Sequence, residues 1–212
     1  MIRQATINDL GSIVKVHINC FPCSYLAQLS KVSCLGDNQL LLFYKEFIID
    51  NPELFWVAED ENDGIVGFCM GYYMDKDSQI KNFMHKNRVA IAWKTLFLLL
   101  ACNKYVWRKM IARIKHKPTI NDWTIVNNKY ESLDNTQRGD LLSVCVLPKY
   151  RSTGYAQKLM EAYLKSMKNN GRKICLLSVK QDNKRAIKYY ERNGFELYRT
   201  RGNEGYTYIK LL

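Results

Sequence analysis

Residues 141–156 read LLSVCVLPKYRSTGYA and decide the fold. The first seven are aliphatic or small and form a run of the length of a buried strand, which Pro148 ends because proline cannot donate to a strand ladder. Gly154 can adopt backbone angles that are closed to other residues. An amphipathic helix is predicted next, ending at Gly171. Its apolar face consists of Ala156, Leu159, Met160, Tyr163, Leu164 and Met167.

A strand that turns directly into a helix presents free backbone N–H groups, and the helix dipole favours negative charge at the same place. Lys149 and Arg151 add positive charge beside this turn. The pattern therefore indicates a phosphate or pyrophosphate site. The spacing matches neither the P-loop nor the dinucleotide fingerprint, so an ordinary βα turn is an equally weighted alternative on these residues alone.

A second motif follows. After Val146-x-Pro-x-x-Arg-x-x-Gly-x-Ala156 and a predicted strand at 173–179, the chain reads Asn183-x-x-Ala-x-x-Tyr-Tyr-x-x-x-Gly-Phe195. Together these motifs resemble the GNAT superfamily of acetyl-coenzyme A-dependent N-acetyltransferases. The resemblance implies an α/β (α+β) fold in which helices flank a mixed, largely antiparallel sheet that is splayed where 141–147 parts from 173–179. It also implies acetyl-coenzyme A as acetyl donor, with no metal.

The same resemblance assigns site residues. Tyr190 matches the tyrosine that donates to the coenzyme sulfur, with core packing as the alternative. Asn183 matches a residue on the pantetheine arm and is also a candidate helix N-cap. The expected coenzyme-binding residues are Val144, Cys145, Val146, Arg151, Ser152, Thr153, Gly154, Tyr155, Ala156, Asn183, Ala186 and Tyr189.

The acceptor amine must lose a proton, so a carboxylate or a water chain is the expected base. Asp140, at the start of the central strand, is the first candidate and the second predicted catalytic residue beside Tyr190. A solvated turn residue is an equally good interpretation of Asp140. Glu131 and Asp134, in the preceding segment, are weaker candidates.

Length and composition favour one globular domain over residues 1–212. The net charge of +12 favours anionic partners, although no basic run or binding module points to nucleic acid. The seven cysteines are scattered, and the lone pair Cys20 and Cys23 has no second pair or histidines at zinc spacing. Reduced thiols and a cytoplasmic location are expected, because the N-terminus enters a strand-like segment without a signal-peptide pattern.

The first half of the chain predicts a strand at 2–7, a helix from Leu10 to Phe21 with His17 packed on its apolar face, and helical segments at 25–29 and 40–49. By resemblance these helices line the acceptor pocket, which makes Phe21, Tyr25 and Tyr44 candidate acceptor contacts or core residues. Strands at 54–59 and 65–73 form a hairpin, in which Gly67 and Gly71 mark a bulge or a close backbone approach.

A long helical insert, at about 75–138, departs from the plain family pattern. Its run 89–102 is almost wholly apolar, flanked by basic residues, and shorter than the roughly 20 residues that span a bilayer. One interpretation is burial against the sheet, over the acceptor site or in a homodimer contact. The other is peripheral membrane contact through 87–117. The unbroken segment Leu96–Leu100 favours burial. Residues 121–134 are expected to form a loop over the active site.

The sequence thus predicts an acyltransferase that acetylates the primary amine of a small molecule. Phe21-Pro22, the Leu- and Tyr-rich helix after it and the insert resemble GNAT proteins of bacterial polysaccharide and sugar-nucleotide enzymology, which implies an amino-sugar acceptor. The charge suits a phosphorylated one. Two alternatives stay open: acetylation of a protein or peptide amine, and a non-catalytic acetyl-coenzyme A-binding sensor or assembly subunit.

Overall fold

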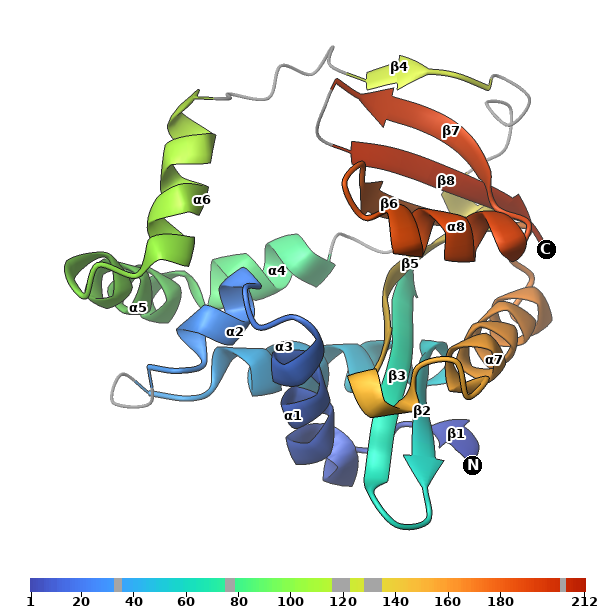
Figure 1. The fold of residues 1–212 in the computed structure, drawn as a ribbon, viewed down its shortest axis with the longest axis horizontal. Helices are drawn as coiled ribbons and strands as arrows, with labels where there is room; N and C mark the ends of the chain where they lie inside the picture. The colour runs from blue at the N-terminus through green and yellow to red at the C-terminus, as the bar shows by residue number, and fades with distance from the viewer. Residues whose placement is uncertain (33–35, 75–78, 116–122, 128–134, 203–204) are drawn as a thin grey trace.

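An eight-stranded sheet organises the chain in the computed structural model, which describes residues 1–32, 36–74, 79–115, 123–127, 135–202 and 205–212 (Figure 1). The strand order is β1-β2-β3-β5-β6-β8-β7-β4, and β5–β6 is the one parallel pair among the described strands. The mixed, largely antiparallel sheet that the motifs implied is therefore confirmed. The strands are β1 (Ile2–Gln4), β2 (Phe55–Asp60), β3 (Gly64–Tyr73), β4 (Trp123–Ile125), β5 (Arg138–Val146), β6 (Ile174–Lys180), β7 (Glu196–Arg201) and β8 (Gly205–Leu211).

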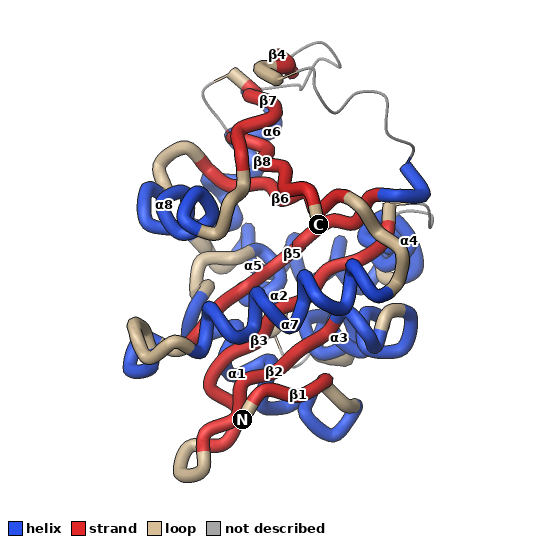
Figure 2. The backbone as a smooth tube through the Cα atoms, turned by 90° about the vertical axis from the view of Figure 1, so that its right-hand side faces the viewer, coloured by secondary structure: helices blue, strands red, loops and turns tan. Residues whose placement is uncertain are grey.

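Helices cover both faces of the sheet. They are α1 (Leu10–Cys20), α2 (Tyr25–Leu29), α3 (Gln39–Asp50), α4 (Gln79–Lys86), α5 (Arg88–Leu100), α6 (Lys104–Lys115), α7 (Tyr155–Asn169) and α8 (Lys184–Arg192). Figure 2 shows α7 crossing one face of β2, β3 and β5, with α1 and α3 on the opposite side. The predicted apolar face of α7 is buried, because Leu159, Met160, Tyr163 and Met167 have no exposed surface.

The two central strands fit together through a bulge. Met70 pairs with Ser143 and Gly71 pairs with Leu141, so Leu142 has no partner on β3. At Gly71 a Cβ atom would lie 2.0 Å from the Tyr163 hydroxyl oxygen and 2.1 Å from the Asp140 carbonyl oxygen. The close approach expected at this glycine is confirmed, and it brings α7 down onto the sheet.

The insert folds as α4, α5 and α6, and its later part adds β4 to the edge of β7. The predicted loop over 121–134 is therefore wrong for 123–125, while 121–122 and 128–134 lie outside the described residues, as do Glu131 and Asp134. The predicted burial of α5 is half right. Ile91, Lys94 and Leu98 are buried, whereas Val89, Trp93 and Leu100 on the other face are exposed.

No single helix among the described residues is long and apolar enough to cross a membrane. The pair α5 and α6 passes by length and composition only when its two helices are taken together, and it is bent by 112°.

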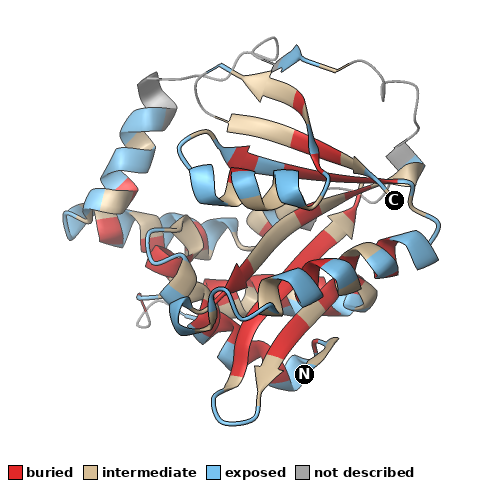
Figure 3. Ribbon diagram, turned by 45° about the vertical axis from the view of Figure 1, so that its right-hand side comes forward, coloured by how far each residue is buried: buried red, intermediate tan, exposed pale blue. Residues whose placement is uncertain are grey.

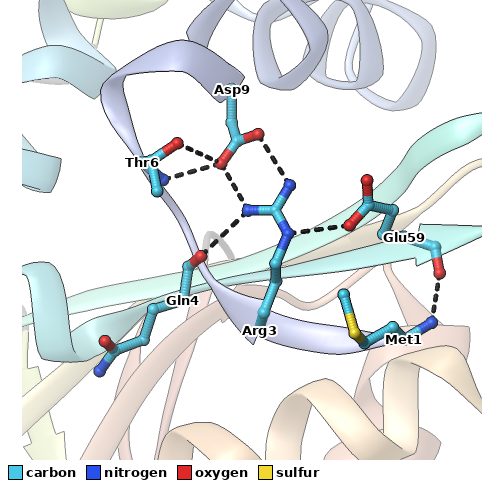
Figure 4. A network of polar contacts seen from close by, with 6 residues as sticks. All are labelled: Met1, Arg3, Gln4, Thr6, Asp9 and Glu59. Carbon is cyan, nitrogen blue, oxygen red and sulfur yellow. Dashed lines mark hydrogen bonds and ion pairs between the residues drawn. The ribbon is translucent and has the colours of Figure 1, made fainter.

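A network of polar contacts ties the first strand to the start of α1 (Figure 4). Arg3 donates to both carboxylate oxygens of Asp9, at 2.7 and 2.9 Å, and its Nε donates to Glu59 Oε2 at 2.8 Å. Asp9 also accepts from the backbone and hydroxyl of Thr6. The Arg3 guanidinium lowers the pKa of the Asp9 carboxyl to about 2, so this carboxylate stays charged in the folded protein.

We expect Asp9→Asn to lower the free energy of unfolding by about 1–2 kcal/mol at pH 7. Because the folded-state pKa lies below the ordinary value near 3.8, the contribution is complete above about pH 4 and disappears as the pH falls toward 2. Urea unfolding at pH 7 and pH 2.5 measures both effects. Asp182→Asn, at an exposed turn, removes the same charge and is expected to change little. An equal loss in both variants would contradict a specific role of the Arg3–Asp9 pair.

Candidate active site

A cavity of about 860 Å³ opens where β5 and β6 part. The two strands pair from Arg138–Ile174 to Leu141–Leu177 and no further, so the rest of β5 has β3 on one side and the cavity on the other. The predicted splay is confirmed. The volume lies within the range of small-molecule and cofactor sites.

Backbone donors of β5 face this opening. The N–H of Leu147 donates to Val66 on β3, so by strand alternation the N–H groups of Val144 and Val146 point away from β3. Both residues line the cavity together with Cys145. Fixed N–H dipoles of this kind bind a carbonyl oxygen or the amides of an extended ligand.

The loop before α7 forms the second wall. Gly154 has φ of 87° and is the N-cap of α7, so the N–H groups of Tyr155, Ala156 and Gln157 start the helix without intrahelical acceptors. Arg151, Ser152, Gly154, Ala156 and Gln157 line the cavity. A left-handed N-cap followed by free N–H groups is suited to a pyrophosphate.

The turn between β2 and β3 holds this loop from outside. The hydroxyls of Tyr150 and Tyr155 donate to Asp60, at 3.1 and 3.0 Å, and Lys149 Nζ lies 2.7 Å from Asp63 Oδ2. Lys149 therefore pairs with an acid on the surface and is not among the described residues that line the cavity. Thr153 donates to the Tyr150 carbonyl. Thr153 and Tyr155 support the loop and are not among the described residues that line the cavity.

Further positive charge comes from residues that sequence reasoning missed. Lys180 at the end of β6 and Arg185 and Arg192 on α8 line the cavity with Arg151. No spacing rule in the sequence links them, because they meet only when α8 folds back over the splay. With the loop and the β5 amides, they make a set of donors and cations that fits the pyrophosphate and amide-containing arm of coenzyme A.

The two adjacent tyrosines of α8 have different surroundings. Tyr189 donates its hydroxyl to the Ala156 carbonyl at 2.8 Å and so ties α8 to α7. The Tyr190 hydroxyl makes no hydrogen bond within the described part of the chain, and the ring lines the cavity. Burial raises the pKa of Tyr190, so the phenol stays protonated at neutral pH. Asn183 accepts from the Ala186 backbone at 3.2 Å as the helix N-cap, and both residues line the cavity.

The other end of the cavity is apolar. Its walls are the side chains of the residue after α1 and of α2, α3, β3 and β5: Phe21, Leu26, Phe43, Met70 and Leu142. Phe21 and Tyr44 reach the cavity as expected of acceptor contacts. Tyr25 does not, because its hydroxyl bonds Thr95 Oγ1 at 2.5 Å and its ring lies under Lys109.

His17 is packed between two hydroxyl groups and also lies in the cavity wall. Its Nδ1 lies 2.5 Å from the Tyr44 hydroxyl and its Nε2 lies 2.7 Å from Ser24 Oγ, and it lines the cavity. Burial lowers the pKa of His17 to about 4, so the ring is neutral at pH 7. The expectation of a merely packed histidine missed this place at the cavity wall.

Asp140 lies on β5 before the strands part. The Tyr72 hydroxyl donates to its Oδ2 at 3.2 Å, and burial raises the pKa of the Asp140 carboxyl to about 6. The described lining of the cavity holds neither Asp140 nor any other aspartate or glutamate. The structure therefore does not bring the predicted base together with Tyr190.

The thiols of Cys20 and Cys145 meet at the wall. The hydrogen bond with Cys145, followed by Arg151 and Arg185, lowers the pKa of Cys20 against the effect of burial, while burial raises the pKa of Cys145. Both residues line the cavity. No group of three or more metal-ligating side chains occurs in the part of the chain that the structure describes.

The region that holds both motifs also matches known proteins. Residues 120–195 match the model of the acetyltransferase (GNAT) family. The chain is 38% identical over 80 residues to N-alpha-acetyltransferase 30 of Schizosaccharomyces pombe, which covers 35% of this chain and 53% of the relative. The chain thus spans about half the length of the curated relative that it matches.

Solved structures show the same fold over the whole chain. Naa20 of Chaetomium thermophilum in complex with a bisubstrate analogue superposes with a TM-score of 0.55 at 16% identity, covering 100% of this chain and 86% of that one. PaiA N-acetyltransferase of Thermoplasma acidophilum, in complex with coenzyme A, gives 0.53 at 15% identity, covering 100% and 98%. The resemblance to the GNAT acetyltransferases that the motifs indicated is confirmed over residues 120–195, and the solved structures show that the whole chain has the same fold.

We expect acetyl-coenzyme A to protect Cys20 from alkylation, because this thiol lies in the wall of the proposed coenzyme site. At ten times the dissociation constant, the free fraction of sites and hence the reaction rate fall about tenfold. Peptide mapping after timed treatment with N-ethylmaleimide measures each thiol separately. Cys23 and Cys102 are exposed outside the cavity and serve as internal controls. An unchanged rate at Cys20 with saturating ligand would place the coenzyme elsewhere.

We expect Asp140→Asn to stabilise the protein relative to wild type by up to about 3 kcal/mol at pH 7 but not at pH 4. The pKa of the Asp140 carboxyl is raised to about 6 in the folded protein, so the free energy of unfolding of the wild-type protein falls as the pH rises from about 4 to 6. Urea unfolding at both pH values tests this sign. Turnover is expected to fall less than about tenfold, whereas losing a general base costs roughly 10²–10⁴-fold. A loss of that larger size would return Asp140 to the mechanism.

Proposed function

We propose that this chain is an acetyl-coenzyme A-dependent N-acetyltransferase whose acceptor is the α-amine of a peptide that begins with a large apolar residue. The observation that carries the proposal is one cavity with two unlike ends. One end offers backbone N–H groups and cations, and the other is walled by Phe21, Leu26 and Phe43. Tyr190 lies in the wall of the same cavity.

The apolar end separates acceptor classes. A sugar carries several hydroxyls, and each loses free energy when it is buried without a hydrogen-bond partner. A large apolar side chain instead gains free energy on entering such a pocket. The relative that supports the peptide alternative is an N-alpha-acetyltransferase by name, and nothing in the comparisons supports the small-molecule amine that the sequence favoured.

The described lining of the cavity contains no carboxylate, and this favours an α-amine over a lysine amine as the acceptor. An α-amine has a pKa of about 7.7–8.0 and is partly neutral at physiological pH, whereas a lysine amine has a pKa of about 10.4. An α-amine therefore needs less help from a base. Neutral His17 and Tyr44 supply polar atoms at this end of the cavity.

Bound acetyl-coenzyme A would supply the acetyl thioester. The reaction forms a C–N bond to the amine and breaks the C–S bond, the amine gives up one proton, and the sulfur takes one. The N–H groups of Val144 and Val146 would stabilise negative charge that develops on the acetyl oxygen. Tyr190 would donate the proton to the sulfur, since its hydroxyl is protonated and not bound within the described chain. Arg151 and the loop to Ala156 would hold the pyrophosphate.

We expect thiol release from acetyl-coenzyme A with peptides whose first residue is Leu, Met or Phe. The value of kcat/KM should exceed that of the same peptide beginning with Ser or Asp by roughly 10–200-fold, the range that apolar pockets achieve. A matched peptide with a blocked α-amine and an internal lysine is the control. Activity with the blocked peptide, or with amino sugars alone, would overturn the proposed acceptor.

We expect Tyr190→Phe to lower turnover by about 10²-fold while leaving the affinity for acetyl-coenzyme A nearly unchanged, because only the proton donor is removed. A thermal shift with the coenzyme and steady-state kinetics separate the two effects. Equal turnover would remove Tyr190 from the mechanism. Coenzyme binding without thiol release from any peptide or amino sugar would favour the non-catalytic sensor.

A further inference from the structure

The chain exposes an apolar face on the insert, away from the cavity lining. Of the fourteen large apolar side chains that are exposed in the described chain, seven belong to α5 and α6, and we call this set the α5–α6 face. They are Val89, Trp93, Leu96, Phe97, Leu100, Trp107 and Ile111. Figure 3 shows α6 at the edge of the molecule with most of its surface exposed. A cluster of exposed apolar side chains of this size indicates an interaction surface, whereas apolar residues that are scattered singly do not.

The geometry of α5 makes this face continuous. Val89, Trp93, Leu96, Phe97 and Leu100 recur at helical spacing on one side, and Trp93 and Leu100 are 60% and 75% exposed. Trp107 of α6 donates its indole N–H to the Leu99 carbonyl at 3.0 Å, which joins α6 to the end of this stripe. The only lysine within the apolar run, Lys94, points the other way and donates to the Asp37 carbonyl at 2.5 Å.

Charge identifies the partner. From residue 78 to residue 121 the sequence has ten lysines and arginines and no aspartate or glutamate, so most of the net charge of +12 comes from this stretch. The side chains of Arg88, Lys104, Arg108 and Lys109 are exposed beside the α5–α6 face. An apolar stripe that includes tryptophans and is bordered by basic residues suits the interface of an anionic bilayer. Nucleic acid would also use the charge but would leave the aliphatic side chains in water.

We propose that the α5–α6 face binds the surface of an anionic lipid membrane, with both helices lying in the interface. The two helices are bent by 112° relative to each other, and α5 has thirteen residues and is therefore about 20 Å long. Both features suit a surface contact better than a membrane span. Ile91, Lys94 and Leu98 fix α5 to the rest of the protein.

The membrane would lie on the acceptor side of the cavity. Tyr25 of α2 bonds Thr95 of α5 at 2.5 Å, and Gln28 accepts from Asn103 at 2.9 Å. Leu26, between them on α2, lines the apolar end of the cavity. Helix α2 therefore contacts both the insert that would bind the lipid surface and the acceptor end of the cavity.

Flotation with vesicles tests the proposal. We expect the protein to float with vesicles of equal parts phosphatidylglycerol and phosphatidylcholine at about 0.05 M salt, and to float less at about 0.5 M, where the Debye length is shorter. Phosphatidylcholine alone should bind it weakly. Trp93→Ser with Phe97→Ser, and separately Lys104→Glu with Arg108→Glu, should each lower the partition coefficient by about tenfold or more.

Matched controls separate this face from general stickiness. Ile49→Ser replaces an apolar side chain on α3 that is 59% exposed, and Lys165→Glu with Lys168→Glu reverses the same charge on exposed α7 positions. Both should float like wild type. Two of the four tryptophans belong to the face, so tryptophan emission should shift to shorter wavelength on binding, and less in the Trp93→Ser variant.

Several results would overturn the proposal: no flotation of wild type at low salt, equal losses in the face and control variants, or vesicle binding that the face variants leave unchanged. A soluble dimer that the face variants dissociate, without vesicle binding, would assign the face to a second copy of this chain. Binding to RNA without binding to vesicles would assign the charge to nucleic acid. Thermal unfolding of each variant verifies that it is folded.

Discussion

The parting of β5 from β6 after Leu141 and Leu177 is the constraint on which the site depends. Up to that point the two strands share a ladder, and beyond it the β5 amides have no partner on that side among the described strands. Unpaired backbone N–H groups are costly unless a ligand or water satisfies them. The same parting opens the cavity, lets α8 lie across the gap and sets the N-terminus of α7 beside the β5 donors. A fully paired β5 would have neither donors nor space.

Contacts outside the cavity keep the gap between β5 and β6 open. The bulge at Leu142 and the close approach at Gly71 let Tyr163 of α7 press onto β3 and donate to the Asp140 carbonyl at 3.0 Å. Asp60 and Asp63 fix the loop of the proposed pyrophosphate site through Tyr150, Tyr155 and Lys149. These contacts lie outside the cavity, yet they determine where its donors point, which is how preorganised dipoles become effective.

The acceptor end of the cavity and the insert are the parts that distinguish this protein from the plain family pattern. In many folds the site's scaffold is shared and the substrate is chosen by what the loops and added elements present to it. Here α2, which carries Leu26 into the cavity, is held by Thr95 of α5 and by Asn103, the residue before α6. The apolar end of the cavity and the insert with its basic, apolar outer face are therefore connected through direct hydrogen bonds to α2.

The sequence by itself determined the sheet class and the splay through the resemblance of its two motifs to the GNAT superfamily. Those motifs rest on local signals: Pro148 after an apolar run, Gly154 at a helix start and the periodic apolar face of α7. Only the tertiary structure decided the rest. Lys180, Arg185 and Arg192 meet Arg151 through chain folding alone, Asp140 lies before the opening, and Lys149 pairs with Asp63. It also decided that α5 buries one apolar stripe and exposes the other. A helix that is apolar all round has no periodicity to reveal which side its neighbours cover.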